Sequence, residues 1–288
     1  MSTVYESFCL THLQRRSNNT KVSCIGIVLQ HTTMRFLCLP GAYGSIEKFK
    51  VQLAPLIKEL ESDKSASFHF IQGSYQVTPP AGYEEFFGGP PYYRFIVPSD
   101  ADADATDVIE RIRDFPQLET PELTMRELMT YGVAKTDDSA RQTLSYLYEL
   151  LEKEGPFDGI IGYSEGATIA GTLLLHEQMR EQNEGRIPVL KCALFFGGWP
   201  PIAPTLDGIV LADESDLTIE VPTTHIIGSL DPYLHGNIAL YNICNPDNAF
   251  IFDHAKGHTL PRDKAMVKEL GDIVRRMIDE VNGGVSPP

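Results

Sequence analysis

The sequence is poor in basic residues, with 24 lysines and arginines against 39 aspartates and glutamates, which leaves a formal net charge of −15. A surface of this sign repels nucleic acid and anionic membrane surfaces, so neither is an expected partner. No apolar run reaches the roughly 20 residues that a membrane-spanning helix needs, and no charged-then-apolar leader is present. We therefore expect a protein that neither spans a membrane nor carries an evident secretion signal.

Cysteine is also scarce, and its spacing gives no sign of a metal site. The five cysteines form an odd set without metal-ligand spacing. Reduced thiols explain such a set, so we expect a cytoplasmic protein with no metal and no other cofactor. Cys38 and Cys192 fall in predicted core strands, where we interpret them as packing residues.

The length and composition fit one enzyme-sized domain. A chain of 288 residues with 42% hydrophobic content can bury a large core as a single α/β domain. Strand-like and helical runs alternate, which predicts a mostly parallel sheet covered by helices on both faces. The spacing predicts helices over residues 46–60, where Pro55 should kink or divide the helix, and over residues 139–153.

The most informative motif is Gly-Tyr-Ser-Glu-Gly at residues 162–166. It lies between an apolar strand-like run, residues 157–161, and a small-residue helix, residues 167–175. A nucleophilic serine at a strand-to-helix turn needs this context, because the tight turn leaves no room for flanking side chains. The helix N-terminus also favours the negative charge that develops during acyl transfer. Ser164 is therefore the candidate nucleophile.

A nucleophilic serine needs a histidine base and an acid that orients it, which follow in this architecture in the order Ser, Asp or Glu, His. Asp231 ends a strand-like run that begins at residue 221, so its carboxylate is expected at the edge of the sheet where Ser164 also emerges. Residues 249–254 predict a further strand, and the loop after it carries His258. We predict Asp231 as the acid and His258 as the base.

Other titratable residues compete for these roles. His225, inside a predicted strand, is better explained as a packed structural histidine. His254 lies at a strand end beside Asp253 and is a weaker candidate base, and His235 follows Asp231 too closely to form the required hydrogen bond, which suits a loop or pocket rim. Three acidic residues of a predicted surface loop rank below Asp231 as the acid: Asp213, Glu214 and Asp216.

The loop after the first core strand normally supplies half of the oxyanion hole. Residues 33–39 predict that strand, and residues 40–44 predict a glycine-rich loop after it. We expect the backbone N–H groups of Ala42 and Glu165 to converge on the substrate oxyanion. An ordinary glycine turn is the alternative interpretation of this loop.

Taken in order, the motifs resemble those of the fungal family of serine hydrolases, FSH, within the α/β-hydrolase superfamily. The resemblance covers about residues 35–262 and rests on these stretches: residues 36–41, 52–56, 86–94, 155–167, 222–231 and 257–262. It implies a catalytic triad of Ser164, Asp231 and His258, which are the residues that the motifs themselves indicate. It also implies a sheet of about six strands and a lid insertion at about residues 99–138. Residues 1–32 match nothing in the family, so we interpret them as an extension of unknown role before a hydrolase domain at 33–288.

The chain departs from the family pattern at two positions. Pro40 stands before Gly41 where family members usually carry histidine, which removes a side chain that helps to organise the oxyanion loop. Glu165 stands where many members carry glutamine. A carboxylate that pointed inward here would disfavour a nearby anion, so we expect Glu165 to point away or to pair with a cation.

The insertion has an acidic first half and a methionine-rich second half. Its repeated Asp-Ala pattern, which includes Asp100, Asp102, Asp104 and Asp107, lacks the glycine and closing glutamate of a calcium loop, so we interpret it as a solvated loop. Residues 124–131 are amphipathic, which suits a lid over an apolar acyl site and equally suits a plain surface helix. The candidate lid residues are Met125, Leu128, Met129 and Tyr131.

Aromatic residues in loops after strands complete the candidate pocket. We expect Tyr43 and Trp199 to contribute to substrate binding. Four other aromatics could line an acyl tunnel or fill the core beneath loops: Phe86, Phe87, Tyr92 and Tyr93.

The function that we predict is acyl hydrolysis through an acyl-serine intermediate. The resemblance implies either cleavage of small esters or, in secondary metabolism, release of a polyketide acyl chain from the carrier domain of a synthase. The diverged insertion favours a polyketide-releasing thioesterase, although an acidic surface does not suit a carrier domain, which is itself usually acidic. The alternatives are a general carboxylesterase for short or medium acyl esters and a non-catalytic binding protein on a hydrolase fold. Whether water or an internal nucleophile accepts the acyl group stays open.

Overall fold

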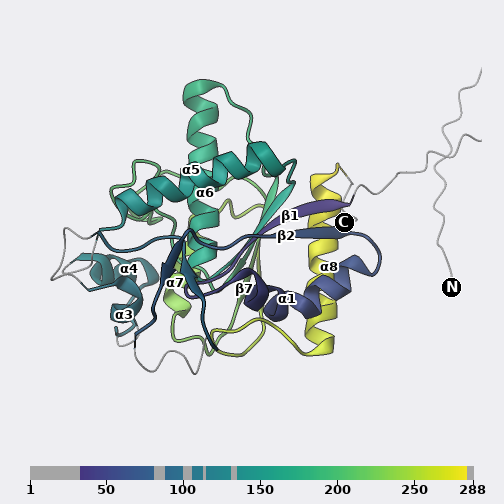
Figure 1. Cartoon of the computed structure of the whole chain (residues 1–288), viewed down its shortest axis with the longest axis horizontal. Coiled ribbons are helices and arrows are strands. Elements are labelled where there is room, and N and C mark those ends of the chain that lie inside the picture. Colours follow the sequence, from purple (N-terminus) through teal and green to yellow (C-terminus); the bar gives the residue numbers. More distant parts are fainter. Residues whose placement is uncertain (1–32, 81–87, 100–105, 113–114, 131–134, 284–288) are drawn as a thin grey trace, which may run out of the picture. The chain divides into compact units, whose positions relative to one another are not determined.

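A six-stranded parallel sheet forms the centre of the protein in the computed structural model (Figure 1). The model describes residues 33–80, 88–99, 106–112, 115–130 and 135–283. The strands, in their order across the sheet, are β2 (Ala66–Phe70), β1 (Met34–Leu39), β5 (Gly159–Tyr163), β6 (Cys192–Phe196), β7 (Thr223–Ile227) and β8 (Ala249–Asp253). The predicted, mostly parallel sheet of about six strands is therefore confirmed, while the predicted extension at residues 1–32 lies outside the described residues.

The inner strands read as continuous apolar runs because both of their faces are covered. All five residues of β6 and all five of β7 are buried, as parallel strands between helix layers must be. Cys38 and Cys192 are fully buried in β1 and β6, so the prediction that they are packing residues is confirmed.

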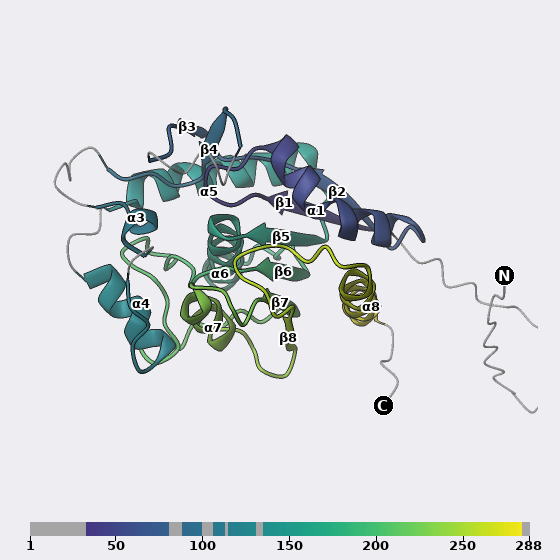
Figure 2. The same cartoon turned by 90° about the horizontal axis from the view of Figure 1, so that it is seen from below.

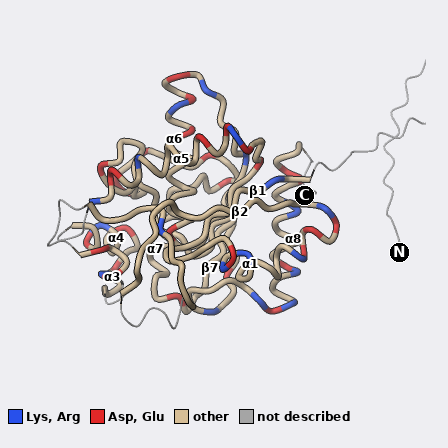
Figure 3. The backbone as a smooth tube through the Cα atoms, viewed as in Figure 1, with Lys and Arg blue, Asp and Glu red and all other residues tan. Residues whose placement is uncertain are grey.

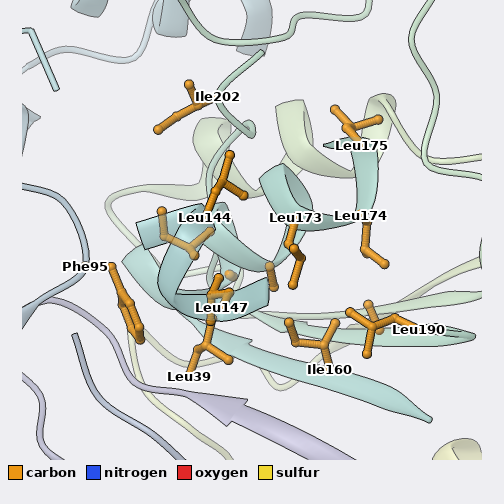
Figure 4. Close-up of a cluster of buried hydrophobic side chains, with 14 of the residues drawn as sticks. Leu39, Phe95, Leu144, Leu147, Ile160, Leu173, Leu174, Leu175, Leu190 and Ile202 are labelled. Atoms are coloured by element: carbon orange, nitrogen blue, oxygen red, sulfur yellow. The ribbon is translucent and has the colours of Figure 1, made fainter. Parts of the chain in front are cut away.

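Helices cover both faces of the sheet (Figures 1 and 2). They are α1 (Ile46–Glu61), α5 (Asp137–Glu154), α6 (Glu165–Glu184), α7 (Leu234–Asn242) and α8 (Lys264–Val281). Residues of α1 and α8 pack with Phe36 and Cys38 on one face, whereas α5 and α6 pack with Leu37 and Leu39 on the other. Figure 4 shows part of the second cluster, with Leu144 and Leu147 of α5 beside Leu173 of α6.

Helix α1 is longer and simpler than predicted. It runs unbroken through Pro55, where the sequence suggested a kink or a division. Proline cannot donate to the carbonyl of Val51, but Val51 is 65% exposed, so this side of the helix faces water that can satisfy the carbonyl. The buried face of α1, which includes Phe49 and Leu53, holds the helix together across this position.

The segment between β2 and α5 forms a second layer beside the carboxyl edge of the sheet. It contains an antiparallel pair, β3 (Tyr75–Val77) and β4 (Tyr92–Arg94), and two helices, α3 (Val108–Ile112) and α4 (Pro121–Thr130). Helix α4 packs against α7, and His235 of α7 lies 2.7 Å from the hydroxyl of Thr124 in α4 (Nδ1 to Oγ1). His235 is thus a contact between two helices and not a loop residue.

The charges of the protein are mixed along its surface. Figure 3 shows acidic and basic residues interspersed over α1, α5 and α8. Within the described ranges, no helix combines the length and the apolarity that crossing a membrane would require.

Candidate active site

The turn between β5 and α6 presents Ser164 at the carboxyl edge of the sheet. Ser164 has φ 53° and ψ −120°, a backbone conformation that residues other than glycine rarely adopt. Such strain is typical of a nucleophile turn. Its N–H donates to the carbonyl of Phe196 at 2.8 Å, which anchors the turn to β6. A side chain at Gly162 or Gly166 would place Cβ 2.4 Å from backbone atoms. Both glycines are therefore required by the close approach of β5, α6 and the β1–α1 loop.

Asp231 and His258 meet at the same edge. Asp231 follows the end of β7 and His258 follows the end of β8, and Nδ1 of His258 lies 2.8 Å from Oδ2 of Asp231. The buried carboxylate also accepts the N–H of Tyr233 at 2.8 Å and the side-chain amide of Asn237 at 3.1 Å. These contacts fix the carboxylate, so the imidazole is held with Nδ1–H toward the acid and Nε2 free for proton transfer.

The electrostatic environment keeps Asp231 ionised. Burial alone would raise the pKa of Asp231, but the hydrogen bond and charge of His258, the Tyr233 N–H and the Asn237 amide together lower that pKa below its ordinary value. At neutral pH the carboxylate is therefore negative and can stabilise an imidazolium formed at His258.

Aromatic rings hold the His258 loop in place. The hydroxyl of Tyr163 donates to the carbonyl of His258 at 3.1 Å, and the two rings stack with centroids 5.2 Å apart. Tyr233 contacts the imidazole edge-on at 5.0 Å. Ser164 and His258 line the same cavity, and among the described contacts no hydrogen bond yet joins them, as is common in enzymes without substrate.

The competing histidines and carboxylates occupy structural positions. Burial lowers the pKa of His225 to about 3, so this ring is neutral in the core of β7, where Nε2 lies 3.1 Å from the Thr223 hydroxyl. His254 is 2% exposed at the end of β8. Asp253 accepts the N–H groups of Ser229 and Ala255, which makes it a turn residue. Asp213 and Glu214 both pair with the partly exposed Arg126 of α4.

The β1–α1 loop lies directly beside the nucleophile. The N–H of Gly44 donates to the carbonyl of Gly41 at 3.0 Å, and an ideal Cβ at Gly41 would lie 3.0 Å from Cβ of Ser164. Ala42 and Glu165 both line the cavity next to Ser164. This arrangement can offer two backbone N–H groups to one substrate oxygen.

Glu165 is buried and paired with a cation, as its position beside the nucleophile led us to expect. Its Oε1 accepts from Nε of Arg94 at 2.9 Å, and its Oε2 accepts from the N–H of Phe95 at 2.9 Å. Arg94 is 3% exposed and also pairs with Asp107, so Asp107 is not solvated as the acidic pattern suggested. The other aspartates of that pattern, Asp100, Asp102 and Asp104, lie outside the described residues. Burial raises the pKa of Glu165, and the charge of Arg94 opposes this rise.

The buried pair predicts a strong dependence of stability on Arg94. Arg94→Met should lower the free energy of unfolding by about 3 kcal/mol, because two carboxylates in a largely dry environment lose their cation. The matched control is Arg126→Met, whose partners Asp213 and Glu214 are half exposed, and it should cost less than about 1 kcal/mol. Denaturant unfolding measures both losses. Equal losses for the two variants would show that the Arg94 cluster has no special role in the fold.

A cavity of about 590 Å³ opens beside Ser164. It is bordered by four of the residues predicted to bind substrate: Tyr43, Met125, Met129 and Trp199. Leu128 is fully buried and packs with Leu211 and Ala239 instead of bordering the cavity. Tyr131 lies outside the described residues. Helix α4 therefore combines the two roles that its sequence allowed, a lid and a surface helix. One face borders the cavity, and the other packs on α7.

None of the remaining candidate aromatics that the structure describes borders the cavity. Tyr92 is 5% exposed and, like Tyr93, does not border the cavity. Phe86 and Phe87 lie outside the described residues. Of the proline-rich segment after β6, Pro200 borders the cavity beside Trp199.

Asn237 and Arg94 are among the residues of the site that were not predicted from the sequence. Asn237 lies in α7, a helix without a motif, six residues after Asp231, and its side-chain amide reaches the carboxylate. Arg94 belongs to a motif stretch but gives no local sign of its partners, since Glu165 lies 71 residues away. The signal in the sequence that could have indicated Arg94 is Glu165 itself, because a buried carboxylate needs a cation.

Comparison with known proteins agrees with this geometry. Residues 29–270 match the family model described as Serine hydrolase (FSH1). Hydrolase phiM of Talaromyces stipitatus is 26% identical over 243 residues, which cover 82% of this chain and 84% of that protein. Esterase FPY3 of Fusarium mangiferae is 26% identical over 248 residues, which cover 84% of this chain and 94% of that protein.

Solved structures are similar to this chain at lower sequence identity. The carboxylesterase of Bacillus cereus is 20% identical, with a TM-score of 0.46 over 85% of this chain and 89% of that one. Arabidopsis thaliana SOBER1 is 15% identical, with a TM-score of 0.48 over 85% and 99%. The family match extends over most of the chain and includes the strand-to-helix serine, the acid and the histidine. The chain is thus an enzyme that belongs to the FSH1 family of serine hydrolases.

Proposed function

We propose that this serine hydrolase is a thioesterase that releases an acyl chain of the polyketide type from the carrier domain of a synthase. The observation that carries the proposal is that Ser164 and His258 border a largely apolar cavity of about 590 Å³. Such a volume accommodates a medium-sized acyl chain. The resemblance to polyketide-releasing members of the family supports the same substrate class.

In the proposed mechanism, His258 removes the proton of Ser164 as the serine oxygen attacks the acyl carbonyl. Asp231 holds the imidazole in the required tautomer and stabilises its positive charge. The N–H groups of Ala42 and Glu165 stabilise the tetrahedral oxyanion. His258 then protonates the leaving thiolate, and a water molecule activated by the same histidine releases the acid from the acyl-serine.

Burial of the Glu165 side chain matters to this mechanism because the mechanism assigns the backbone N–H of Glu165 to the oxyanion. A free carboxylate beside the oxyanion would oppose the negative charge that develops there. The ion pair with Arg94 directs the carboxylate toward β4 and compensates its charge. A glutamate at position 165 is therefore compatible with acyl transfer.

Ester hydrolysis is the second candidate, favoured by the name of the related esterase of Fusarium mangiferae. The two candidates are distinguished by comparing two octanoyl substrates, a thioester and an oxygen ester, whose leaving groups have the same carbon skeleton. The quantity to measure is kcat/KM for the thioester divided by kcat/KM for the oxygen ester. A ratio well above that of alkaline hydrolysis supports the thioesterase, and a ratio at or below it supports the carboxylesterase. If a fluorophosphonate probe does not label Ser164, both proposals fail and a binding role without catalysis remains.

The acyl-chain pocket makes a prediction about substrate length. Met129→Ala should lower kcat/KM for dodecanoyl substrates more than for acetyl substrates, because each lost methylene contact is worth about 0.8 kcal/mol. Leu128→Ala is the matched control on the same helix, since Leu128 packs on Ala239 and Leu211 and should lower thermal stability without changing chain-length preference. Kinetics with a series of chain lengths and thermal unfolding measure both effects. An equal loss for acetyl and dodecanoyl substrates in Met129→Ala would place the acyl chain elsewhere.

We also propose that the reaction takes place in the cytoplasm, where synthase carrier domains would be accessible. The three described cysteines, Cys38, Cys192 and Cys244, are free thiols, which suits a reducing compartment. Fluorescence of a tagged full-length chain in living cells tests this location.

A further inference from the structure

The two sides of the cavity differ in chemistry. Helices α3 and α4 supply five apolar side chains to the wall: Val108, Ile109, Ile112, Met125 and Met129. Helix α1 supplies Lys48 and Gln52, which lie four residues apart and therefore on one face of the helix. Figures 1 and 2 show α1 well separated from α3 and α4 in both views. The cavity therefore has an apolar end under α3 and α4 and a polar end beside α1.

The catalytic histidine lies between the two ends of the cavity, because its ring contacts both Tyr163 and Tyr233, and Tyr233 packs with side chains of α3 and α4. The ring of Tyr163 stacks on Phe49 of α1 with centroids 6.3 Å apart and on His258 at 5.2 Å. Thr259, the residue after His258, also borders the cavity. An apolar acyl chain fits the end under α3 and α4, so the leaving group that His258 protonates would extend toward the end where Lys48 and Gln52 lie.

Lys48 carries a positive charge that no described carboxylate matches. Its Nζ donates to the carbonyl of Pro91 at 3.4 Å and lies 4.1 Å from the centre of the Tyr92 ring. Neither contact neutralises the ammonium group, and partial burial lowers the pKa of Lys48 without a carboxylate to oppose it. The other cation of the cavity, Arg94, is by contrast held by Glu165 and Asp107.

The environment of Lys48 suits a ligand that brings its own negative charge. The Pro91 carbonyl and the Tyr92 ring hold the ammonium group of Lys48 in place. Because this group has three N–H donors, it retains donors for an anion. In a chain with a net charge of −15, an unmatched lysine in the wall of the substrate cavity is a local exception to the repulsion of anions.

We propose that Lys48 binds the phosphate of a phosphopantetheine leaving group, with Gln52 and Thr259 as hydrogen-bond partners for the amides of the same arm. This inference rests on the proposed thioesterase function and narrows its substrates to thioesters that carry a phosphate on the thiol side. The phosphate is favoured over an acidic group on the acyl chain because the acyl end of the cavity is lined by apolar side chains of α3 and α4. Acyl-coenzyme A and a carrier-bound acyl chain both contain this phosphate.

The test compares octanoyl-phosphopantetheine with octanoyl-pantetheine, which differ only in the phosphate. The wild-type enzyme should show a KM about tenfold lower for the phosphorylated substrate, the size expected for one charge-assisted contact that is partly exposed. In Lys48→Gln the ratio of the two KM values should fall to about one. Lys50→Gln is the matched control, because Lys50 is exposed on the same helix, and it should keep the wild-type ratio.

Each outcome decides a different question. Hydrolysis of octanoyl-pantetheine at any useful rate tests the thioesterase function independently of the phosphate, so a failure there removes the function and not only the role of Lys48. Hydrolysis of both thioesters by the wild-type enzyme with equal KM values overturns the role of Lys48 and leaves the function intact. If the ratio of the two KM values fell equally in Lys48→Gln and Lys50→Gln, the cause would be a general effect of charge. That result would also overturn the role of Lys48. Octanoyl-coenzyme A and an octanoyl carrier domain, assayed in parallel, show which source of the phosphate is preferred.

Discussion

Ser164→Ala is expected to lower turnover on the order of 10⁶-fold, and His258→Ala should have an effect of similar size. The reason is that neither residue does useful chemistry alone, since the serine needs a base and the base has no other nucleophile. The double variant should therefore lose little more than either single variant. Single-turnover kinetics with a chromogenic acyl substrate, on protein whose folding is checked by circular dichroism, measures all three.

The double variant provides the decisive comparison. If its loss equalled the product of the two single losses, Ser164 and His258 would be acting independently and their assignment as one catalytic unit would be wrong. His254→Ala serves as a control, because His254 is buried at the end of β8 and takes no part in the proposed mechanism. It should affect stability more than turnover.

Asp231→Asn is expected to lower turnover by about 10⁴-fold while the protein remains folded. The carboxylate oxygen that accepts from Nδ1 of His258 at 2.8 Å would become part of an amide, which favours the wrong tautomer of the imidazole. The side-chain amide of Asn237 donates to the same oxygen at 3.1 Å. After the substitution, this amide would compete with the new amide at position 231 for the same place. Measurement of kcat across pH 6 to 9 reports the loss.

The control for this prediction is Asp253→Asn. Asp253 accepts two backbone N–H groups in an exposed turn and makes no contact with His258 among the described residues, so activity should stay close to that of the wild type. A large loss for Asp253→Asn with a small loss for Asp231→Asn would move the acid to Asp253 and reopen the choice of His258.

The parts of the fold that the sequence predicted well depend on local patterns. The apolar runs of β5, β6 and β7 and the glycines around Ser164 carry their structural meaning within a few residues. The order of Ser164, Asp231 and His258 along the chain then follows from the parallel sheet, because consecutive strand ends meet at one edge. The amino-acid sequence alone is therefore sufficient to predict the fold class and the grouping of these three side chains.

The parts that were not predicted depend on contacts between distant segments. Met129 borders the cavity, whereas Leu128 lies on the core face of the same helix. This difference depends on how α4 lies on α7, which helical periodicity alone does not determine. The continuity of α1 through Pro55 depends on its packing in the core and on exposure of the opposite side. The pairing of Arg94 with Glu165 joins β4 to the start of α6, two elements with no shared sequence pattern.

The pairing of one guanidinium with two carboxylates also constrains how this sequence can change over evolutionary time. Replacement of Arg94 before Glu165 would leave a buried carboxylate without a cation, whereas replacement of Glu165 by the glutamine that many family members carry would leave Arg94 still paired with Asp107. The two orders of substitution therefore pass through intermediates of very different stability. Substitutions at positions 94, 107 and 165 are therefore expected to be non-additive, and paths that change position 165 first should retain more stability.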